Sequence, residues 1–181
     1  GTWSNALSNS QSGAGNAVGS TYLATITSRL ENSIASRAVN YQESWLGARR
    51  VTGIGTDNQW RWVTGPEGTA NSGAGTTFFI QTGNGIGNVI SGYFSNWSSS
   101  EPNNYVSGAG NTDYALEYES VLQFTGTQGQ WNDLTGGPSY TINTPQTLSY
   151  YVKETNQAAS PLTINAGAGT VTFSGAVGTS K

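Results

Sequence analysis

The chain has 181 residues, which is enough for one domain with a sizeable core and a short appended element. Charged residues make up only 9% of the chain and aromatic residues 11%, a balance that argues against a disordered protein. The net charge of −3, with no basic cluster beyond Arg49 and Arg50, argues against nucleic-acid binding. The absence of Cys and His excludes disulfides, thiolate zinc sites and most transition-metal chemistry. Any metal must therefore be a hard cation held by oxygen atoms.

The first part of the chain predicts two helices. Residues 3–7 place apolar side chains at helical spacing, and residues 22–26 then form an extended approach to a second helix. Ser28, followed three places later by Glu31, is a capping box that marks a helix start. An apolar stripe follows the cap and predicts a helix over residues 28–40, with members Leu30, Ile34, Ala35 and Ala38.

From Ser44 onward the pattern changes to short aromatic strands bounded by turn residues. Residues 64–112 show little periodicity, which predicts a long loop of the kind that usually carries function. Helices followed by short strands around one long loop predict an α+β fold and not alternating βαβ units. The expected strands cover residues 45–48, 60–63, 114–124, 130–131 and 148–154.

The last residues differ from the rest. Residues 162–165 and 171–174 alternate apolar and polar side chains, which predicts a hairpin. We therefore expect one domain over residues 1–156, and a β-rich extension or the start of a neighbouring module over 157–181. The chain is then part of a larger multidomain protein.

Three short runs concentrate carboxylate and amide oxygens at strand edges or within the long loop. They are residues 101–104, 111–113 and 131–133. Calcium takes six to eight oxygen ligands of these types, so three converging runs would supply most of a coordination shell. Because Asn and Asp also favour turns, spacing alone leaves a structural interpretation open.

An ordered set of motifs spread over residues 3–154 resembles the C-type lectin family. The resemblance implies a C-type lectin-like fold, with two helices and short antiparallel strands around a long calcium-binding loop. The motifs that carry it are Leu23–Ser28 with Glu31 and Asn32, Trp45–Gly47, Trp60–Trp62 with Thr64 and Gly65, Phe94–Trp97, Glu101–Asn103, Trp131–Asp133 and Tyr151–Glu154.

The same resemblance implies a ligand set. Glu101, Asn103, Asn132 and Asp133 would bind one calcium ion, which in turn coordinates two neighbouring hydroxyls of a sugar ring. The protein ligands would also hydrogen-bond those hydroxyls. The Glu-Pro-Asn order is the family's signature for mannose, glucose or fucose, and the peptide bond before Pro102 is expected to be cis.

The chain departs from the family pattern in several places. The fifth ligand is either Asp113 or Asn111, and we prefer Asp113; Asn104 is a candidate for a second ion. The family's cysteines are missing, as in disulfide-free members found in large bacterial surface adhesins. An insertion at about residues 69–90 would narrow or extend the binding surface.

Family members normally open with a strand that pairs with the last strand, whereas this chain starts at the first helix. An unpaired edge strand invites aggregation. We therefore hypothesise that the tail strands, at residues 162–164 or 171–173, cover the edge of the strand over 148–154.

The expected function is calcium-dependent binding of glycans or cell-surface glycoconjugates by a module of an extracellular adhesin. No apolar run approaches the ~20 residues of a membrane span, and no signal peptide is present, so export is inferred or encoded outside this sequence. The alternative is a protein-, peptide- or ice-binding module on the same scaffold.

An enzyme is not expected. Glu117 and Glu119 stand two apart on one strand face, as a glycosidase pair can, but we interpret them as a solvated face. Five tryptophans suit either sugar-stacking platforms or the core, and we favour the core. They are Trp45, Trp60, Trp62, Trp97 and Trp131.

Overall fold

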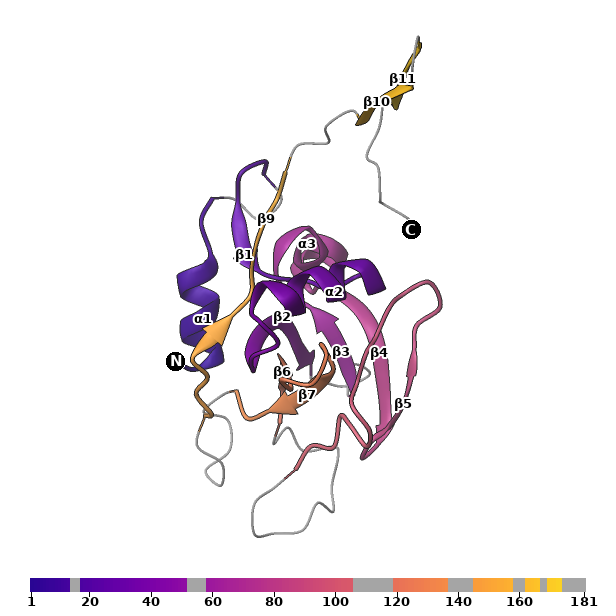
Figure 1. Cartoon of the computed structure of the whole chain (residues 1–181). Helices are drawn as coiled ribbons and strands as arrows, with labels where there is room; N and C mark the ends of the chain where they lie inside the picture. The colour runs from indigo at the N-terminus through magenta and orange to yellow at the C-terminus, as the bar shows by residue number, and fades with distance from the viewer. Residues whose placement is uncertain are drawn as a thin grey trace.

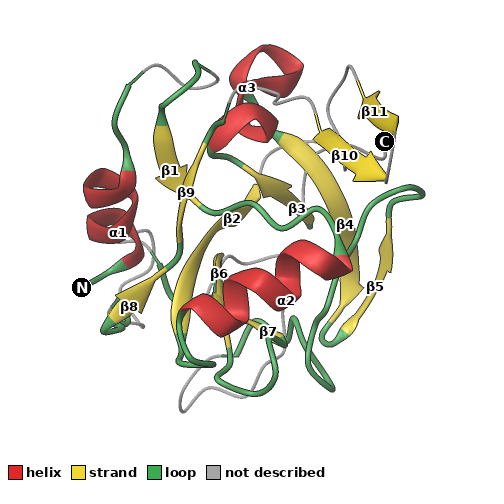
Figure 2. Cartoon of the chain, turned by 45° about the horizontal axis from the view of Figure 1, so that its top comes forward, coloured by secondary structure: helices red, strands yellow, loops and turns green. Residues whose placement is uncertain are grey.

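The computed structural model describes residues 1–13, 17–51, 58–105, 119–136, 145–157, 162–166 and 169–173. Within these residues, three helices lie around a curled antiparallel sheet (Figures 1 and 2), so the predicted α+β class is confirmed. The helices are α1 (Trp3–Ser10), α2 (Arg29–Ala38) and α3 (Gly65–Gly73). None of these described helices has the length and apolar composition needed to cross a membrane.

The two predicted helices begin at the caps that the sequence provides. In α1, the Thr2 hydroxyl accepts a hydrogen bond from the Asn5 N–H at 3.2 Å. In α2, the Ser28 hydroxyl accepts from the Glu31 N–H at 3.2 Å. The Glu31 carboxylate reaches back to the Thr27 N–H at 2.6 Å, one residue before the expected position. The capping box is therefore confirmed, with its return bond shifted by one residue.

Most of the apolar stripe of α2 is exposed. Leu30 and Ile34 are 71% and 62% exposed, whereas Asn32, Ala35 and Ser36 are buried. The buried face is polar because the Asn32 side chain bonds to the core: it accepts from the Trp131 indole N–H at 2.8 Å and donates to the Gly129 carbonyl at 3.1 Å. Helical spacing thus predicts the helix correctly, although of the stripe's members only Ala35 lies on the buried face.

The main sheet has the strand order β5-β4-β3-β2-β6-β7, with neighbours antiparallel, and β8 pairs with β2 in the parallel direction. Its strands are β2 (Ser44–Val51), β3 (Gln59–Trp62), β4 (Thr76–Gly83), β5 (Ile86–Val89), β6 (Val121–Phe124), β7 (Trp131–Leu134) and β8 (Tyr150–Tyr151).

Much of the expected long loop is ordered structure. The stretch predicted as loop over residues 64–112 contains α3 and the β4–β5 hairpin, so that prediction is wrong for this part. Strand β4 lacks regular alternation because its register with β3 shifts beside Phe78, and a bulge of this kind turns two consecutive residues inward. Phe78 and Phe79 are accordingly both buried.

The last strand is covered by residues that precede α2. Strand β1 (Thr21–Leu23) pairs antiparallel with β9 (Lys153–Thr155). Strands β10 (Leu162–Ala166) and β11 (Gly169–Phe173) form the predicted hairpin and, among the described residues, pair only with each other. The hypothesis that the tail strands cover this edge is therefore wrong, because β1 already occupies it.

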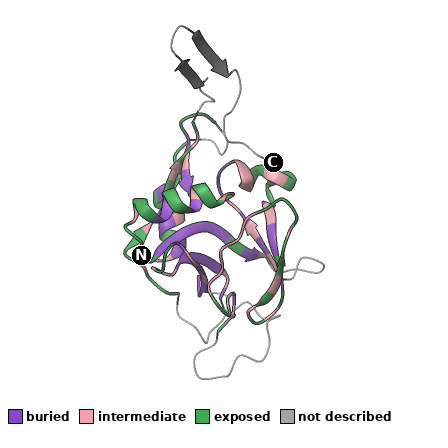
Figure 3. Cartoon of the chain, turned by 45° about the vertical axis from the view of Figure 1, so that its right-hand side comes forward, coloured by how far each residue is buried: buried purple, intermediate pink, exposed green. Residues whose placement is uncertain are grey.

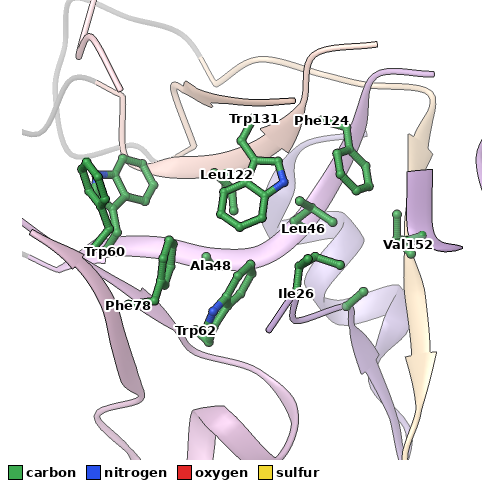
Figure 4. Close-up of a cluster of buried hydrophobic side chains, with 13 residues drawn as sticks. Ile26, Leu46, Ala48, Trp60, Trp62, Phe78, Leu122, Phe124, Trp131 and Val152 are labelled. Carbon is green, nitrogen blue, oxygen red and sulfur yellow. The ribbon is translucent and has the colours of Figure 1, made fainter. Parts of the chain in front are cut away.

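The core lies within and beside the sheet, whose central strands are buried (Figure 3). Trp62 stacks on Phe78 with ring centroids 4.6 Å apart, and Trp131 meets Trp62 edge-on at 5.7 Å (Figure 4). A second cluster gathers around Trp45. The core interpretation is thus confirmed for Trp45, Trp60, Trp62 and Trp131, while Trp97 is partly buried and packs against the same core.

The carboxyl of Glu154 on β9 predicts a pH dependence of stability. Burial and the nearby Glu31 and Glu67 carboxylates raise the pKa of Glu154 to about 7, although Thr25 N–H donates to it at 3.1 Å. The folded state therefore binds a proton that the unfolded chain releases near its ordinary pKa of about 4.3. This contribution is complete below that value and is lost as the pH rises to about 7.

The wild type should lose free energy of unfolding on the order of 2 kcal/mol between pH 5 and pH 8 because of Glu154. We expect Glu154→Gln not to show this part of the loss. Urea unfolding of both proteins at the two pH values measures it. Equal losses in the wild type and the variant would contradict the assignment.

Candidate functional site

The Glu101–Asn103 tripeptide and strand β7 meet at one place. The Glu101–Pro102 peptide is cis, as expected. The Asn103 backbone N–H donates to the Glu101 carboxylate at 2.9 Å and to the Asp133 carboxylate at 3.0 Å, and the Asn103 side-chain amide donates to Glu101 at 2.9 Å. Glu101, Asn103 and Asp133, three of the four predicted ligands, are therefore gathered in one cluster, although up to 32 positions separate them in the sequence.

Asp133 is the fixed point of this cluster. Its side chain is fully buried. One carboxylate oxygen accepts from the Asn103 N–H and the other from the Asn104 N–H at 2.9 Å. These bonds attach the loop to β7, and each carboxylate oxygen keeps a second lone pair for another partner.

The electrostatics of the cluster disfavour two bare carboxylates. Burial, followed by the charge of Asp133, raises the pKa of Glu101 to about 8. Burial also raises the pKa of Asp133, against the hydrogen bonds from the loop that lower it. A buried and a half-buried carboxylate that face each other form an arrangement that a divalent cation stabilises.

Asn132 lies next to Asp133 on β7 but is less closely joined to the cluster. The side-chain oxygen of Asn132 is buried and accepts no hydrogen bond in the part of the chain that the structure describes. A buried carbonyl oxygen without a donor is costly, and a cation would satisfy it.

Glu119 is a site residue that the sequence interpretation missed. It is buried, so the solvated-face interpretation is wrong for this residue; Glu117 lies outside the described residues. Its carboxylate accepts from the Tyr105 N–H at 2.6 Å, and its own N–H donates to the Asn104 side-chain oxygen at 3.0 Å. Burial and the charge of Asp133 raise the pKa of Glu119 to about 9.

The signal that points to Glu119 is its position. It directly precedes Ser120, whose N–H donates to the Leu134 carbonyl at the end of β7, so it enters the sheet beside the predicted ligands. The preferred fifth ligand, Asp113, and its alternative, Asn111, both lie outside the described residues.

The donor set fits a hard cation. Among the described residues, no group of three or more acidic side chains is arranged around a common point. The cluster instead combines two carboxylates with amide oxygens, the mixture that calcium accepts and that soft metals do not.

The β4–β5 hairpin, which falls within the predicted insertion at 69–90, supports the tripeptide. The Pro102 carbonyl accepts from the Gly85 N–H and from the Gln81 side-chain amide, both at 2.8 Å. The side-chain oxygen of Gln81 accepts from the Trp60 indole N–H at 3.2 Å, which links the tripeptide to the core. Gly85 has φ +66°, and a Cβ there would lie 2.6 Å from the Ser100 carbonyl oxygen, so no other residue fits.

Comparison with known proteins gives one match in sequence. No protein-family profile matches the chain. Halomucin of Haloquadratum walsbyi is 35% identical over 82 residues, which are 45% of this chain. The matched part is about 1% of the length of halomucin.

Three solved structures are similar in fold. The mouse scavenger receptor C-type lectin carbohydrate-recognition domain is 19% identical, with a TM-score of 0.41 over 76% of this chain and 74% of that one. The carbohydrate-recognition domain of cow CD23 is 22% identical, with a TM-score of 0.37 over 65% of this chain and 61% of that one. The C-type lectin CEL-I of Cucumaria echinata is 17% identical, with a TM-score of 0.45 over 84% of this chain and 79% of that one. At these values the likeness concerns the fold and says nothing about a ligand.

Proposed function

We propose that this chain is a calcium-dependent carbohydrate-binding module of the C-type lectin type. The observation that carries the proposal is the cluster of Glu101, Asn103 and Asp133, in which the buried Asp133 carboxylate and the half-buried Glu101 carboxylate face each other across an amide. Their mutual repulsion and the hard oxygen donors favour a calcium ion at this place.

The residues that would hold the ion are Glu101, Asn103, Asn132 and Asp133. Glu119 is a further buried carboxylate, on which the charges of Asp133 and Glu101 act. Asp113 stays the proposed fifth ligand. Bound calcium would supply Lewis-acid coordination of two neighbouring sugar hydroxyls. Glu101 accepts hydrogen bonds and Asn103 donates and accepts them, so the pair can read the orientation of the hydroxyls that reach them.

For the ligand we propose sugars with the hydroxyl arrangement of mannose, glucose or fucose, presented on cell-surface glycoconjugates. The acceptor-then-donor order of Glu101 and Asn103 supports this class. We further propose that the chain works outside the cell, as one module of a larger surface adhesin.

Isothermal titration of the whole chain tests the proposal. Mannose, fucose, glucose and galactose are each titrated with calcium and again after chelation, and one or more of the first three should bind in calcium only. Extracellular modules often bind calcium with a Kd on the order of 10⁻⁴–10⁻³ M, so millimolar calcium is used. Calcium binding without any sugar binding would favour a protein- or peptide-binding module instead, and no calcium binding would reject the proposal.

The bridge through Gln81 predicts a loss of calcium affinity without a change in any ligand. Gln81→Met keeps the buried volume but removes the bonds to Pro102 and Trp60. We expect calcium affinity to fall on the order of tenfold, as when a metal ligand loses its supporting hydrogen bonds. We also expect unfolding to become easier by about 2 kcal/mol, because the Trp60 N–H loses its acceptor.

Calcium titration and urea unfolding measure the two effects separately. Thr82→Val, at the exposed neighbouring position on β4, is the matched control and should change neither quantity. An unchanged calcium affinity in Gln81→Met would show that the hairpin does not position the ligands.

A further inference from the structure

A polar groove runs along helix α2, separate from the Glu101 cluster. It lies between α2 and the turn that joins β6 to β7 at residues 125–130, the region where α2 crosses in front of β6 and β7 in Figure 2. Two cavities of about 640 and 260 Å³ form it. Both are lined by Ser33 and Gln128, so they are two parts of one groove.

Two arginines line the groove in a chain whose net charge is −3. Arg37 lines the larger cavity and Arg29 the smaller one, and no acidic residue lines either. Both arginines are exposed, and neither forms a salt bridge that the described residues show. They are eight residues apart on one helix, so about 12 Å separates them along its axis.

The position of Arg29 is unfavourable for the helix itself. It is the first residue of α2, where the helix dipole disfavours a positive charge. Its guanidinium carries five N–H donors in a fixed fork that suits carboxylate and sulfate groups. The Arg29 guanidinium is therefore available to a ligand.

The floor of the groove is held rigidly. The Gly129 carbonyl accepts from the side chains of Asn32 at 3.1 Å and Asn96 at 2.8 Å, which tie the turn to α2 and to the segment before Trp97. A Cβ at Gly129 would lie 2.8 Å from the Asn32 amide and 3.0 Å from Ser36, so the turn packs closely on the helix. Binding here would need little ordering of the protein.

The lining suits a sugar better than a peptide. Hydroxyl and amide side chains predominate, and they can pair with the hydroxyls of a saccharide. Tyr41, 40% exposed, offers a ring face at one end beside Arg37. Tyr41 and Gln128 both have positive φ, at 55° and 45°, and strained backbone of this kind gathers at binding sites.

We propose that this groove binds an acidic saccharide, with its carboxylate or sulfate groups on Arg29 and Arg37 and its hydroxyls on the amides between them. The groove offers no carboxylate to a metal, so this binding is independent of calcium. It adds a second carbohydrate site, on a different part of the fold, to the one proposed at Glu101.

Amide chemical shifts of the whole chain, recorded in the presence of a chelator, test the proposal. The probes are a hyaluronan tetrasaccharide, which carries carboxylates, a sulfated chondroitin tetrasaccharide, and the neutral chitotetraose. Shifts at Ser33, Arg37 and Gln128 with either acidic probe and not with the neutral one are the expected result. A response to the sulfated probe alone would identify sulfate as the recognised anion. No acidic-specific shift at these residues would overturn the proposal.

Variants and a peptide complete the test. Arg29→Gln and Arg37→Gln should each lower the affinity for the acidic probe on the order of tenfold, as expected for a lost charge-assisted hydrogen bond. Lys153→Gln removes the same charge from exposed β9, outside the groove, and should leave the affinity unchanged. Equal losses in all three variants would indicate only long-range attraction. Equally tight binding of hexaglutamate would reject the saccharide class.

Because the chelator removes calcium, these outcomes do not depend on the Glu101 site. A chain that fails to bind mannose or fucose in calcium would not contradict the groove proposal. A chain that fails to bind the acidic probes would not contradict the calcium site proposed at Glu101.

Discussion

Asparagine in place of Asp133 should abolish calcium-dependent sugar binding and leave the fold intact. Asp133 contributes one of the two facing carboxylates, and Asn removes its charge while keeping its shape. We expect calcium affinity to fall on the order of 100-fold or more, beyond the loss seen when only a supporting residue is changed. Titration of the variant with calcium and then with mannose or fucose measures both effects.

The choice of asparagine follows from the hydrogen bonds. Asp133 accepts from the Asn103 and Asn104 N–H groups through different oxygens. Alanine would remove the carboxylate oxygen that accepts from the Asn104 N–H and one of the two acceptors of the Asn103 N–H. The loss of a buried hydrogen bond costs about 1–3 kcal/mol and would confuse loss of metal with loss of fold. Asparagine keeps one acceptor and relieves the repulsion from Glu101, so its stability without calcium should stay close to that of the wild type.

Melting temperatures with and without calcium give an independent measurement. A ligand that binds only the folded state stabilises it in proportion to the logarithm of its concentration. Calcium should therefore raise the melting temperature of the wild type and of Glu43→Gln, which removes an exposed carboxylate elsewhere. It should not raise that of Asp133→Asn. Equal stabilisation of all three proteins would place the calcium ion somewhere else.

Local sequence signals predicted the elements that depend on local interactions. The cap of α2 needs only Ser28 and Glu31, three residues apart, and the helix begins there. The β10–β11 hairpin needs only alternation and a short turn. The β4–β5 hairpin was missed because its inward residues are set by a bulge against β3, which is a long-range contact.

The same distinction holds at the site. Glu101, Asn103 and Asp133 belong to motifs, and the structure brings these three together. Glu119 belongs to no motif, and its role depends on the pairing of β6 with β7 and on its burial beside Asp133. Gln81 likewise looks like an ordinary strand residue until the hairpin places it between Trp60 and Pro102.

The largest effect on stability is expected at Trp131, which precedes the two proposed ligands on β7. Its ring is fully buried, with Phe94 at 5.5 Å and Trp97 at 6.0 Å between ring centroids. Its indole N–H donates to the Asn32 side chain at 2.8 Å. Trp131→Ala should lower the free energy of unfolding by about 3–5 kcal/mol, because it opens a large cavity and leaves the Asn32 oxygen without a donor.

Urea unfolding of Trp131→Ala and of Tyr93→Ala separates a core tryptophan from an exposed aromatic residue. Tyr93 is 41% exposed, and its loss should change the free energy of unfolding by less than about 1 kcal/mol. Since domains of this size are stable by only about 5–15 kcal/mol, the Trp131 variant loses a large share of the total. A small loss at Trp131, together with lost sugar binding in a fully folded variant, would instead make this ring a stacking platform and overturn its assignment to the core.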